Sequence, residues 1–350
     1  MKLYSGIDLH SNNSHIGIKN KRGERLFSKR IPNDLNTILK TLSPYKSEIE
    51  EIVVESTYNW YWLVDGLQAN DYPVVLANPG AMKQYNGLKH TDDKSDAFFL
   101  AELSRLNILP TGYIHSPATR EIRDVLRRRL LFVRNRTAQY LSLKSSLTRN
   151  IGKTYTKEFI KKLNTKKLEE ILPGKPDLCF LLERQLELIN FMSTEIHEIE
   201  KRVYNKIKLK SEFIKLKTIP GVGLILGLTI MLETGNIERF KKVGNYTSYC
   251  RCATAAGYSN DKKKCNNNRK NGNKYLSWAF IEAAHCMVRV CKPAQKFYQR
   301  KKSKVNGALA SKALAAKLSK AVYYILKNQE DFDVFKIFGF NPAAVNQCRD

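Results

Sequence analysis

The stretch LYSGIDL, residues 3–9, decides how the first part of this chain is expected to fold. It has the apolar character of a buried strand, yet it places Asp8 between Ile7 and Leu9. A carboxylate inside an apolar strand is unfavourable unless it is paired or binds a cation. The segment therefore predicts a strand with a functional carboxylate, and an edge or turn position for Asp8 is the ordinary alternative.

The residues that follow extend this strand into a sheet. Two more short strands joined by polar turns come first, and helices then alternate with strands. A three-strand meander followed by such alternation is typical of a mixed α/β domain. Strands are expected at 14–19, 25–31, 51–56 and 72–78, and helices at 35–47, 59–69 and 94–105.

Three further acids could converge with Asp8 at one end of this sheet. Glu55 closes the fourth strand, and Asp93 and Asp96 are three residues apart at a helix start, a spacing that shares one helix face. This order of acids is the pattern of a ribonuclease-H-like fold. Carboxylate clusters hold divalent ions for phosphodiester chemistry, and hard oxygen ligands favour Mg²⁺ or Mn²⁺.

Each acid taken alone has a simpler interpretation. Glu55 could cap a helix that starts near Thr57, and Asp92, Asp93 and Asp96 could form a solvated helix N-terminus. A GID strand also occurs in actin-like ATPases, but this sequence lacks the glycine-rich phosphate loops that such a protein needs. The order of the four acids along the chain is more specific for a ribonuclease-H-like fold than any one acid.

The charge balance points to a polyanionic partner. The 350 residues include 60 Lys and Arg against 33 acids, a formal net charge of +27, and 43% are hydrophobic. That length predicts two or three domains, and that composition can build cores. Nucleic acid is favoured because contacts to phosphates release counterions. A membrane surface is the main rival, but no amphipathic basic anchor stands out.

The remaining bulk features favour the cytoplasm. The start, MKLYSGIDLH, does not look like a signal peptide, and no apolar run is long enough to span a bilayer. The seven cysteines are odd in number and form no framework, which predicts reduced thiols. Cys250, Cys252 and Cys265 lack zinc-site spacing, so ordinary thiols are expected there.

Two long helical patterns form the middle of the chain. The first, 119–150, is rich in arginine and resembles a nucleic-acid-binding stripe. The second, 177–213, has an apolar residue every seven positions, which indicates either a helical hairpin within one chain or a coiled coil that also pairs protomers. The heptad positions are Leu182, Ile189, Ile196 and Val203.

The last part mixes apolar helices with one strongly polar tract. IPGVGLILGLTIMLETG, 219–235, resembles a helix-hairpin-helix turn, a weak signal, whose backbone amides could meet a phosphate. The tract SNDKKKCNNNRKNGNK, 259–274, is too polar for a core. Helices are expected at 275–290 and 308–328.

Several long motifs in one order resemble the transposases of the IS110 insertion-sequence family, and more closely those of its IS1111 subgroup. The resemblance covers nearly the whole chain. The motifs are GIDLHS (6–11), VVESTYNWYWLVDGL (53–67), LANPGAMKQY (76–85), LKHTDDKSDAFFLAEL (88–103), IPGVGLILGLTIMLETGNIERF (219–240), YCRCATAAGYSNDKKK (249–264) and RKNGNKYLSWAFIEAAH (269–285).

The resemblance implies an architecture and a set of site residues. It implies a RuvC-like domain at 1–116, a helical coiled-coil segment at 117–213 and a C-terminal serine transposase domain at 214–350. It implies Ser259 as a nucleophile, although Cys265 and Asp261 depart from the glycines usual in similar proteins. The implied metal ligands, a DEDD set in which the family spacing selects Asp93 over Asp92, are Asp8, Glu55, Asp93 and Asp96.

The implied function is recombination of DNA guided by a non-coding RNA of the element. Donor and target DNA, the guide RNA and a homodimer or homotetramer are the implied partners, in a bacterial cytoplasm near the nucleoid. The serine has no obvious His or Lys base beside it, so the carboxylate cluster would activate it. Cations expected to bind phosphates are Arg120, Arg123, Arg127, Arg128, Lys262, Lys263, Lys264, Arg269, Lys270 and Lys274.

Two other functions remain open from the residues. A RuvC-like structure-specific nuclease would cut DNA with a metal-activated water and without a covalent serine step. A non-catalytic nucleic-acid-binding protein could keep the same fold. The simpler interpretation of Ser259 itself is a turn-capping hydroxyl before Asn260 and Asp261.

Overall fold

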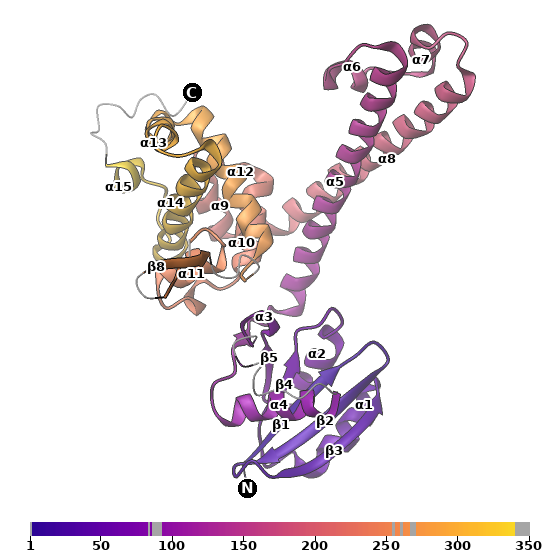
Figure 1. The fold of residues 1–350 in the computed structure, drawn as a ribbon. Helices are drawn as coiled ribbons and strands as arrows, with labels where there is room; N and C mark the ends of the chain where they lie inside the picture. Colours follow the sequence, from indigo (N-terminus) through magenta and orange to yellow (C-terminus); the bar gives the residue numbers. More distant parts are fainter. Residues whose placement is uncertain are drawn as a thin grey trace. The chain divides into compact units, whose positions relative to one another are not determined.

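The computed structural model describes residues 2–82, 85, 93–253, 256–259, 262–266 and 271–339, with the backbone alone at 93, 94, 256–259 and 262–266. The chain separates into two compact units, Met1–Pro117 and Ala118–Asp350 (Figure 1). Within the described residues, every helix is too short or too polar to cross a membrane.

A mixed sheet forms the first unit. Its six described strands lie in the order β3-β2-β1-β4-β5-β6. The first three strands form an antiparallel meander, β4 runs parallel to β1 and to β5, and β6 is antiparallel to β5. The strands are β1 (Leu3–Leu9), β2 (Asn13–Asn20), β3 (Arg25–Pro32), β4 (Ile49–Glu55), β5 (Val74–Ala77) and β6 (Thr111–Gly112).

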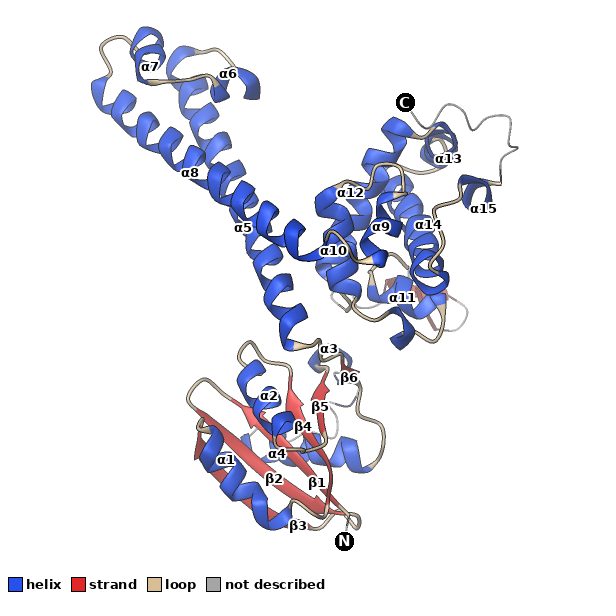
Figure 2. Ribbon diagram, turned by 180° about the vertical axis from the view of Figure 1, so that it is seen from behind, coloured by secondary structure: helices blue, strands red, loops and turns tan. Residues whose placement is uncertain are grey.

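Helices cover both faces of this sheet (Figures 1 and 2). Helices α1 (Leu35–Leu42) and α2 (Tyr61–Ala69) pack in one apolar cluster with β1 and β4, and α4 (Asp93–Arg105) packs in another with β4 and β5. The short helix α3 (Pro79–Met82) follows β5. The mixed α/β sheet that the order of strands and helices predicts is confirmed, and it is consistent with the ribonuclease-H-like fold that the order of the acids predicts.

The predicted helix limits shift where local chemistry intervenes. The helix expected over 35–47 ends at Leu42, because Pro44 cannot continue it, and a 3-10 turn covers Ser43–Tyr45. Helix α2 begins at Tyr61 with Trp60 at its N-cap, so the suggestion that Glu55 caps a helix starting near Thr57 is wrong.

Two long helices open the second unit. The helices are antiparallel, because residues further along the first helix pair with residues earlier in the second. The pairs are Arg129–Glu200, Arg136–Ser193 and Ser142–Gln185. The two helices are α5 (Pro117–Ile151) and α8 (Pro176–Ile207), with α6 (Lys157–Lys161) and α7 (Thr165–Ile171) in the connection, at one end of the hairpin in Figure 2.

The four heptad residues of α8 are all buried. Leu182 and Ile189 pack with α5 residues in one cluster, and Val203 belongs to the core of the C-terminal helices. This arrangement uses the seam within one chain, as in the helical-hairpin interpretation, while pairing of protomers stays a prediction. The helix expected to reach 213 ends at Ile207, and a separate helix follows it.

The C-terminal helices share one core with the base of the long hairpin. Leu126 of α5 and Ile207 of α8 lie in the same cluster as residues of every long C-terminal helix. The segments expected as separate domains at 117–213 and 214–350 therefore pack together. The elements are α9 (Ser211–Lys217), α10 (Leu224–Thr234), the 3-10 turn Ile237–Arg239, α11 (Val243–Tyr249), β7 (Ala256–Ser259), β8 (Lys262–Asn266), α12 (Lys274–Val290), α13 (Lys292–Lys302), α14 (Gly307–Asn328) and α15 (Val334–Phe338).

The Pro-Gly turn before α10 serves packing. Gly221 has a φ of +83°, and a Cβ there would lie 2.6 Å from the backbone nitrogen of Met287 in α12. Glycine allows both the left-handed backbone and this close approach. The close approach of α12 thus accounts for the glycine at position 221 without a phosphate. Contact between this turn and a phosphate stays a prediction.

The described cysteines are free thiols, as the sequence predicts. Cys250 and Cys252 are buried in the C-terminal core. Burial raises the pKa of the Cys252 thiol to about 12, and it raises the pKa of Cys250 as well. Such thiols are protonated and poorly reactive at neutral pH. Cys265 has no described side chain, so the role of that residue stays open.

Candidate functional site

The sheet brings two of the predicted acids to the same end of two neighbouring strands. Ile7 of β1 lies opposite Val54 of β4, so Asp8 and Glu55 are the next residues along these parallel strands. Successive side chains of a strand point to opposite faces. Ile7 and Val54 pack with α1 and α2, so both carboxylates belong to the other face, which α4 covers.

Helix α4 brings a third acid to that face. A Cβ on Gly6 would lie 2.0 Å from the Ala97 carbonyl oxygen, so the glycine lets the helix backbone touch β1. Asp96 is half-buried and adjacent to Ala97 in the helix. Asp93 is the first residue of α4, and its side chain lies outside the described part of the chain. Three of the four predicted carboxylates therefore share one region of the fold.

An ion-pair cluster fixes α4 on the sheet. Glu102 of α4 accepts hydrogen bonds from Lys19 of β2, at 2.5 Å, and from Arg105, at 2.5 Å. The hydrogen bond from Arg105, and then that from Lys19, holds the pKa of Glu102 at about 2. The ionised carboxylate thus joins the helix that carries Asp96 to the strand beside β1.

The donor set suits a hard divalent cation in kind, because its members are carboxylates. Asp8 is 5% exposed, and its Oδ2 lies 3.1 Å from Nε2 of His10. Carboxylates brought together disfavour one another's charge unless a cation joins them, and oxygen ligands suit Mg²⁺ or Mn²⁺. The described side chains do not form a ready-made group of three or more metal ligands, and Asp93 is not among them.

The structure places Ser259 in a β-hairpin that sequence analysis missed. Ser259 ends β7, and its backbone pairs with that of Lys262 at the start of β8. The polar tract, which the sequence predicts only to lie outside a core, is thus partly a two-stranded sheet, with three consecutive lysines on the returning strand. The side chains of the serine and of these lysines lie outside the described residues, as do Arg269 and Lys270 altogether.

One backbone and one side-chain hydrogen bond hold the two ends of this hairpin segment together. The Asn273 N–H donates to the Tyr249 carbonyl oxygen at 2.6 Å, and Arg251 Nε donates to the Gly272 carbonyl oxygen at 3.0 Å. Gly272 has a φ of +88°, and a Cβ there would lie 2.4 Å from the Tyr249 oxygen. A larger residue at 272 would separate the chain entering the hairpin from the chain leaving it.

A buried carboxylate that sequence analysis missed lies beside this point. Glu233 of α10 is 2% exposed and accepts two hydrogen bonds from Arg127 of α5, at 2.6 and 2.7 Å. Burial is the largest influence on Arg127 and opposes its charged form, but the hydrogen bonds to Glu233 and the charges nearby, that of Glu233 first, together outweigh it, so the pKa of Arg127 is raised. The signal was a lone acid in the apolar run 219–235, the same signal that singles out Asp8.

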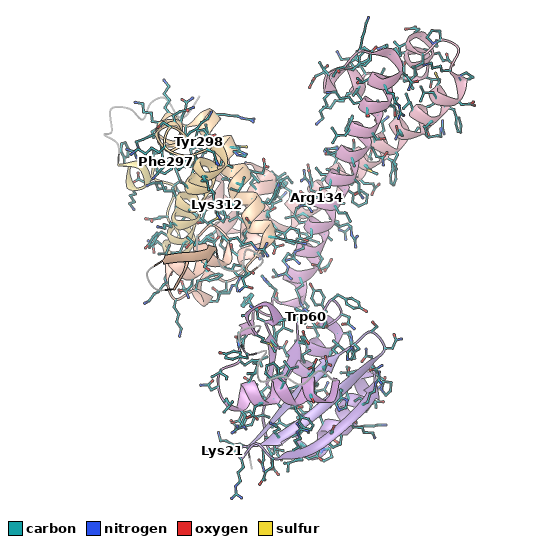
Figure 3. All side chains as sticks on the ribbon, in the orientation of Figure 1. Lys21, Trp60, Arg134, Phe297, Tyr298 and Lys312 are labelled. Carbon is teal, nitrogen blue, oxygen red and sulfur yellow. The ribbon has the colours of Figure 1, made fainter. Side chains whose placement is uncertain are left out.

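The predicted arginine stripe is mostly turned into the protein. Arg120 and Arg123 are 2% and 7% exposed, and Arg127 is paired with Glu233. Of the four predicted phosphate-binding arginines of α5, only Arg128 is exposed. The expected nucleic-acid-binding stripe is therefore corrected: Arg120 and Arg123 are buried, and Arg127 is held in an ion pair. Arg134, labelled in Figure 3, is a second exposed cation of α5.

Sequence analysis also missed a basic surface on α13. Residues 283–329 contain no Asp or Glu and 11 Lys or Arg. Lys292, Lys296 and Arg300 are exposed at four-residue spacing on α13, while Phe297 is partly buried against the core. Figure 3 labels Phe297 and its neighbour Tyr298 on this helix. Lys274, which the sequence predicts as a phosphate contact, is exposed at the start of α12.

Comparisons with known proteins agree with this architecture. Residues 5–150 match a family model of the DEDD domain of IS110 transposases, described as "Transposase", and residues 215–299 match one described as "Transposase IS116/IS110/IS902 family". The chain belongs to the IS110 family of transposases. A curated relative, the transposase for insertion sequence element IS1328 of Yersinia enterocolitica, is 25% identical over 246 residues, which cover 67% of this chain and 69% of the relative.

This membership places the described features in an enzyme. An IS110-family transposase acts on DNA, so DNA is a partner of this chain. The first match spans the sheet and α5, and it carries the DEDD name that the four acids would supply, which suggests the use of a divalent metal. The second match spans α10, the β7–β8 hairpin and α12, where Glu233 and Ser259 lie.

Proposed function

We propose that this IS110-family transposase cuts and rejoins DNA with Ser259 as the nucleophile and with Asp8, Glu55, Asp93 and Asp96 as metal ligands. One observation carries the proposal. β1, β4 and α4 bring three of these acids to one side of the sheet in a chain whose family works on DNA. The resemblance to the IS1111 subgroup supports the serine.

The reaction follows from the groups that the chain supplies. The Ser259 hydroxyl attacks a phosphodiester phosphorus, and a phosphoserine bond forms as the bond to the leaving deoxyribose oxygen breaks. The serine loses its proton, and the leaving oxygen gains one. A divalent cation bound by the four acids would stabilise the charge on the attacking and leaving oxygens. In the second transfer a DNA hydroxyl attacks the phosphoserine, releases the serine and restores the phosphodiester.

We further propose that the partners are donor DNA, target DNA and a guide non-coding RNA, bound by a homodimer or homotetramer. The net charge of +27 supports a large polyanionic partner. The cations proposed to contact phosphates are Arg128, the lysines of β8, and Lys292, Lys296 and Arg300 of α13. Sequencing of the RNA that co-purifies with the protein tests the guide. An RNA from the element's own flank, with segments that match donor and target, is expected, and random cellular RNA would contradict it.

A RuvC-like nuclease is the second candidate. It is favoured by the position of the carboxylates, since Asp8, Glu55 and Asp96 all belong to the first unit and Ser259 to the second. Such an enzyme would hydrolyse DNA with water and would need nothing from the β7–β8 hairpin. It would leave free ends and no covalent protein–DNA intermediate.

Two substitutions separate these functions. Ser259→Ala should abolish strand exchange while leaving DNA binding within about twofold, and Asp8→Asn should abolish all cleavage by removing one charged ligand. Recombination of donor and target plasmids measures the first, and nicking of labelled DNA measures the second. A Ser259→Ala protein that recombines normally would remove the serine from the mechanism. One that still cleaves without rejoining would favour the nuclease.

A further inference from the structure

The contacts of Glu233 reach from α5 to the base of the Ser259 hairpin. A carboxylate buried this deeply needs partners for each of its oxygens. Arg127 supplies two, because its Nε and Nη2 donate to Oε1 and Oε2 in the bidentate geometry that makes arginine pairs strong. Asn273 supplies a third, from Nδ2 to Oε2 at 2.7 Å. The ring of Tyr275 lies 4.4 Å from the guanidinium carbon of Arg127.

Asn273 uses both ends of its amide in this arrangement. Its Oδ1 accepts from the backbone N–H groups of Tyr275, at 2.8 Å, and Leu276, at 3.1 Å, and so caps α12. Its Nδ2 faces Glu233. The carboxylate accepts hydrogen bonds and cannot donate them, so it fixes which end of the amide points toward it. Aspartate could cap the helix equally well, but it could not donate to Glu233.

The same residue is where the hairpin segment returns to the helical core. Its N–H bonds to Tyr249, which ends α11 just before the hairpin. The residues next to the two ends, Arg251 and Gly272, both have left-handed backbones, with φ of +56° and +88°. The chain therefore leaves and re-enters the core at one fixed point, and that point is tied through Glu233 to α5.

We propose that Arg127, Glu233 and Asn273 form a positioning cluster that fixes the base of the β7–β8 hairpin and thereby the placement of Ser259. The part that concerns the serine rests on the proposed function. These residues act through Gly272 and the hairpin backbone, so the proposed role is positioning and requires no contact with the reacting atoms. Because α5 supplies Arg127, the cluster also connects the hairpin to the long helical segment.

Asn273→Asp is the sharpest test, because it keeps the cap of α12, removes the donor to Glu233 and places a second carboxylate against it. We expect formation of a serine–DNA adduct on a nicked suicide substrate to slow at least tenfold, with duplex DNA affinity within about twofold. Hydrogen exchange of the backbone amides of 256–266 should quicken at least tenfold. Glu200→Gln is the matched control, since it breaks the ion pair of another α5 arginine, Arg129–Glu200 at 2.6 Å, and leaves Arg127, Glu233 and Asn273 unchanged.

A double variant guards against a merely structural explanation. Arg127→Met with Glu233→Met replaces the buried ion pair by apolar side chains of similar size, a change that often preserves stability. We expect it to melt near the wild type and still to form adduct slowly, because Asn273 has lost its acceptor. If the double variant matches the wild type in both melting temperature and rate of adduct formation, the cluster only stabilises the fold and the proposal is wrong.

The two readouts keep this proposal distinct from the proposed function. A wild type that forms adduct on Ser259, with Asn273→Asp equally fast and equally protected from exchange, would overturn the positioning role alone. A wild type that forms no adduct would end the serine mechanism, and the exchange of 256–266 in Asn273→Asp would still decide whether the cluster anchors the hairpin. Unchanged exchange in that variant overturns the anchoring in either case.

Discussion

Gly6 shows how one residue sets the distance between α4 and the sheet. A Cβ at this position would lie 2.0 Å from the Ala97 carbonyl oxygen and 2.9 Å from the Ala101 nitrogen, both in the backbone of α4. Neither atom can move without moving the helix. Gly6 and Asp8 share a face of β1, so any shift of α4 also moves Asp96 relative to Asp8.

Gly6→Ala is therefore expected to destabilise the full-length chain by at least about 2 kcal/mol and to abolish DNA cleavage. Thermal unfolding and the nicking assay measure the two effects. Gly112→Ala is the control in the same sheet, where a Cβ would meet ordinary neighbours at 3.4 Å or more, and it should change stability by less than about 0.5 kcal/mol. Normal cleavage by Gly6→Ala would contradict the close packing of α4 on β1.

The element that holds this geometry is α4, and Glu102 gives its attachment a pH dependence. The pKa of Glu102 is lowered from an ordinary 4.5 to about 2 in the folded protein. A carboxyl whose pKa is lower in the folded state than in the unfolded state stabilises the fold above the unfolded pKa. That contribution is lost as the pH falls from about 4.5 to about 2.

Glu102→Gln should accordingly cost roughly 1–3 kcal/mol of stability at pH 7 and much less near pH 2. Urea unfolding at a series of pH values gives the difference between variant and wild type. Glu50→Gln is the matched control, because its ion pair with Lys2 is about half exposed and contributes little. A Glu102→Gln penalty that stays constant from pH 7 to pH 2 would show that the charge of Glu102 does not hold α4.

Elements with regular apolar patterns were predictable, and those without them were not. The first three strands follow short apolar stretches at residues 3–31, and Asp8 stood out as a charge between Ile7 and Leu9. The β7–β8 hairpin is made of polar residues, so no alternation marks it, and α13 has few apolar residues on its inner face. Arg127 looked like a phosphate ligand, because its partner Glu233 lies 106 residues away in the sequence.

For the whole molecule, the burial of the α5 arginines moves the expected nucleic-acid surface toward α13. Replacing Lys292, Lys296 and Arg300 together by Ala should weaken duplex DNA binding at least tenfold at physiological salt. The slope of log affinity against log salt should fall by about 0.9 for each phosphate that the variant no longer neutralises. Fluorescence anisotropy at several salt concentrations measures both.

A charge-matched control tests whether the position of these cations matters. Lys161, Lys162 and Lys166 are exposed near α6 and α7, where acids such as Glu158 are close in sequence. Their replacement by Ala removes the same charge and should weaken binding no more than about threefold. Equal losses of affinity in the two triple variants would mean that net charge alone attracts DNA. A loss of affinity confined to RNA would reassign the α13 surface to a guide.

The most direct measurement is to trap the protein–DNA intermediate on a nicked suicide substrate and to locate the linked residue by mass spectrometry. The account predicts one DNA strand joined to Ser259, formed only with Mg²⁺ or Mn²⁺ and absent in Asp8→Asn. DNA joined to another residue, or the same adduct formed by Asp8→Asn without divalent metal, would contradict it.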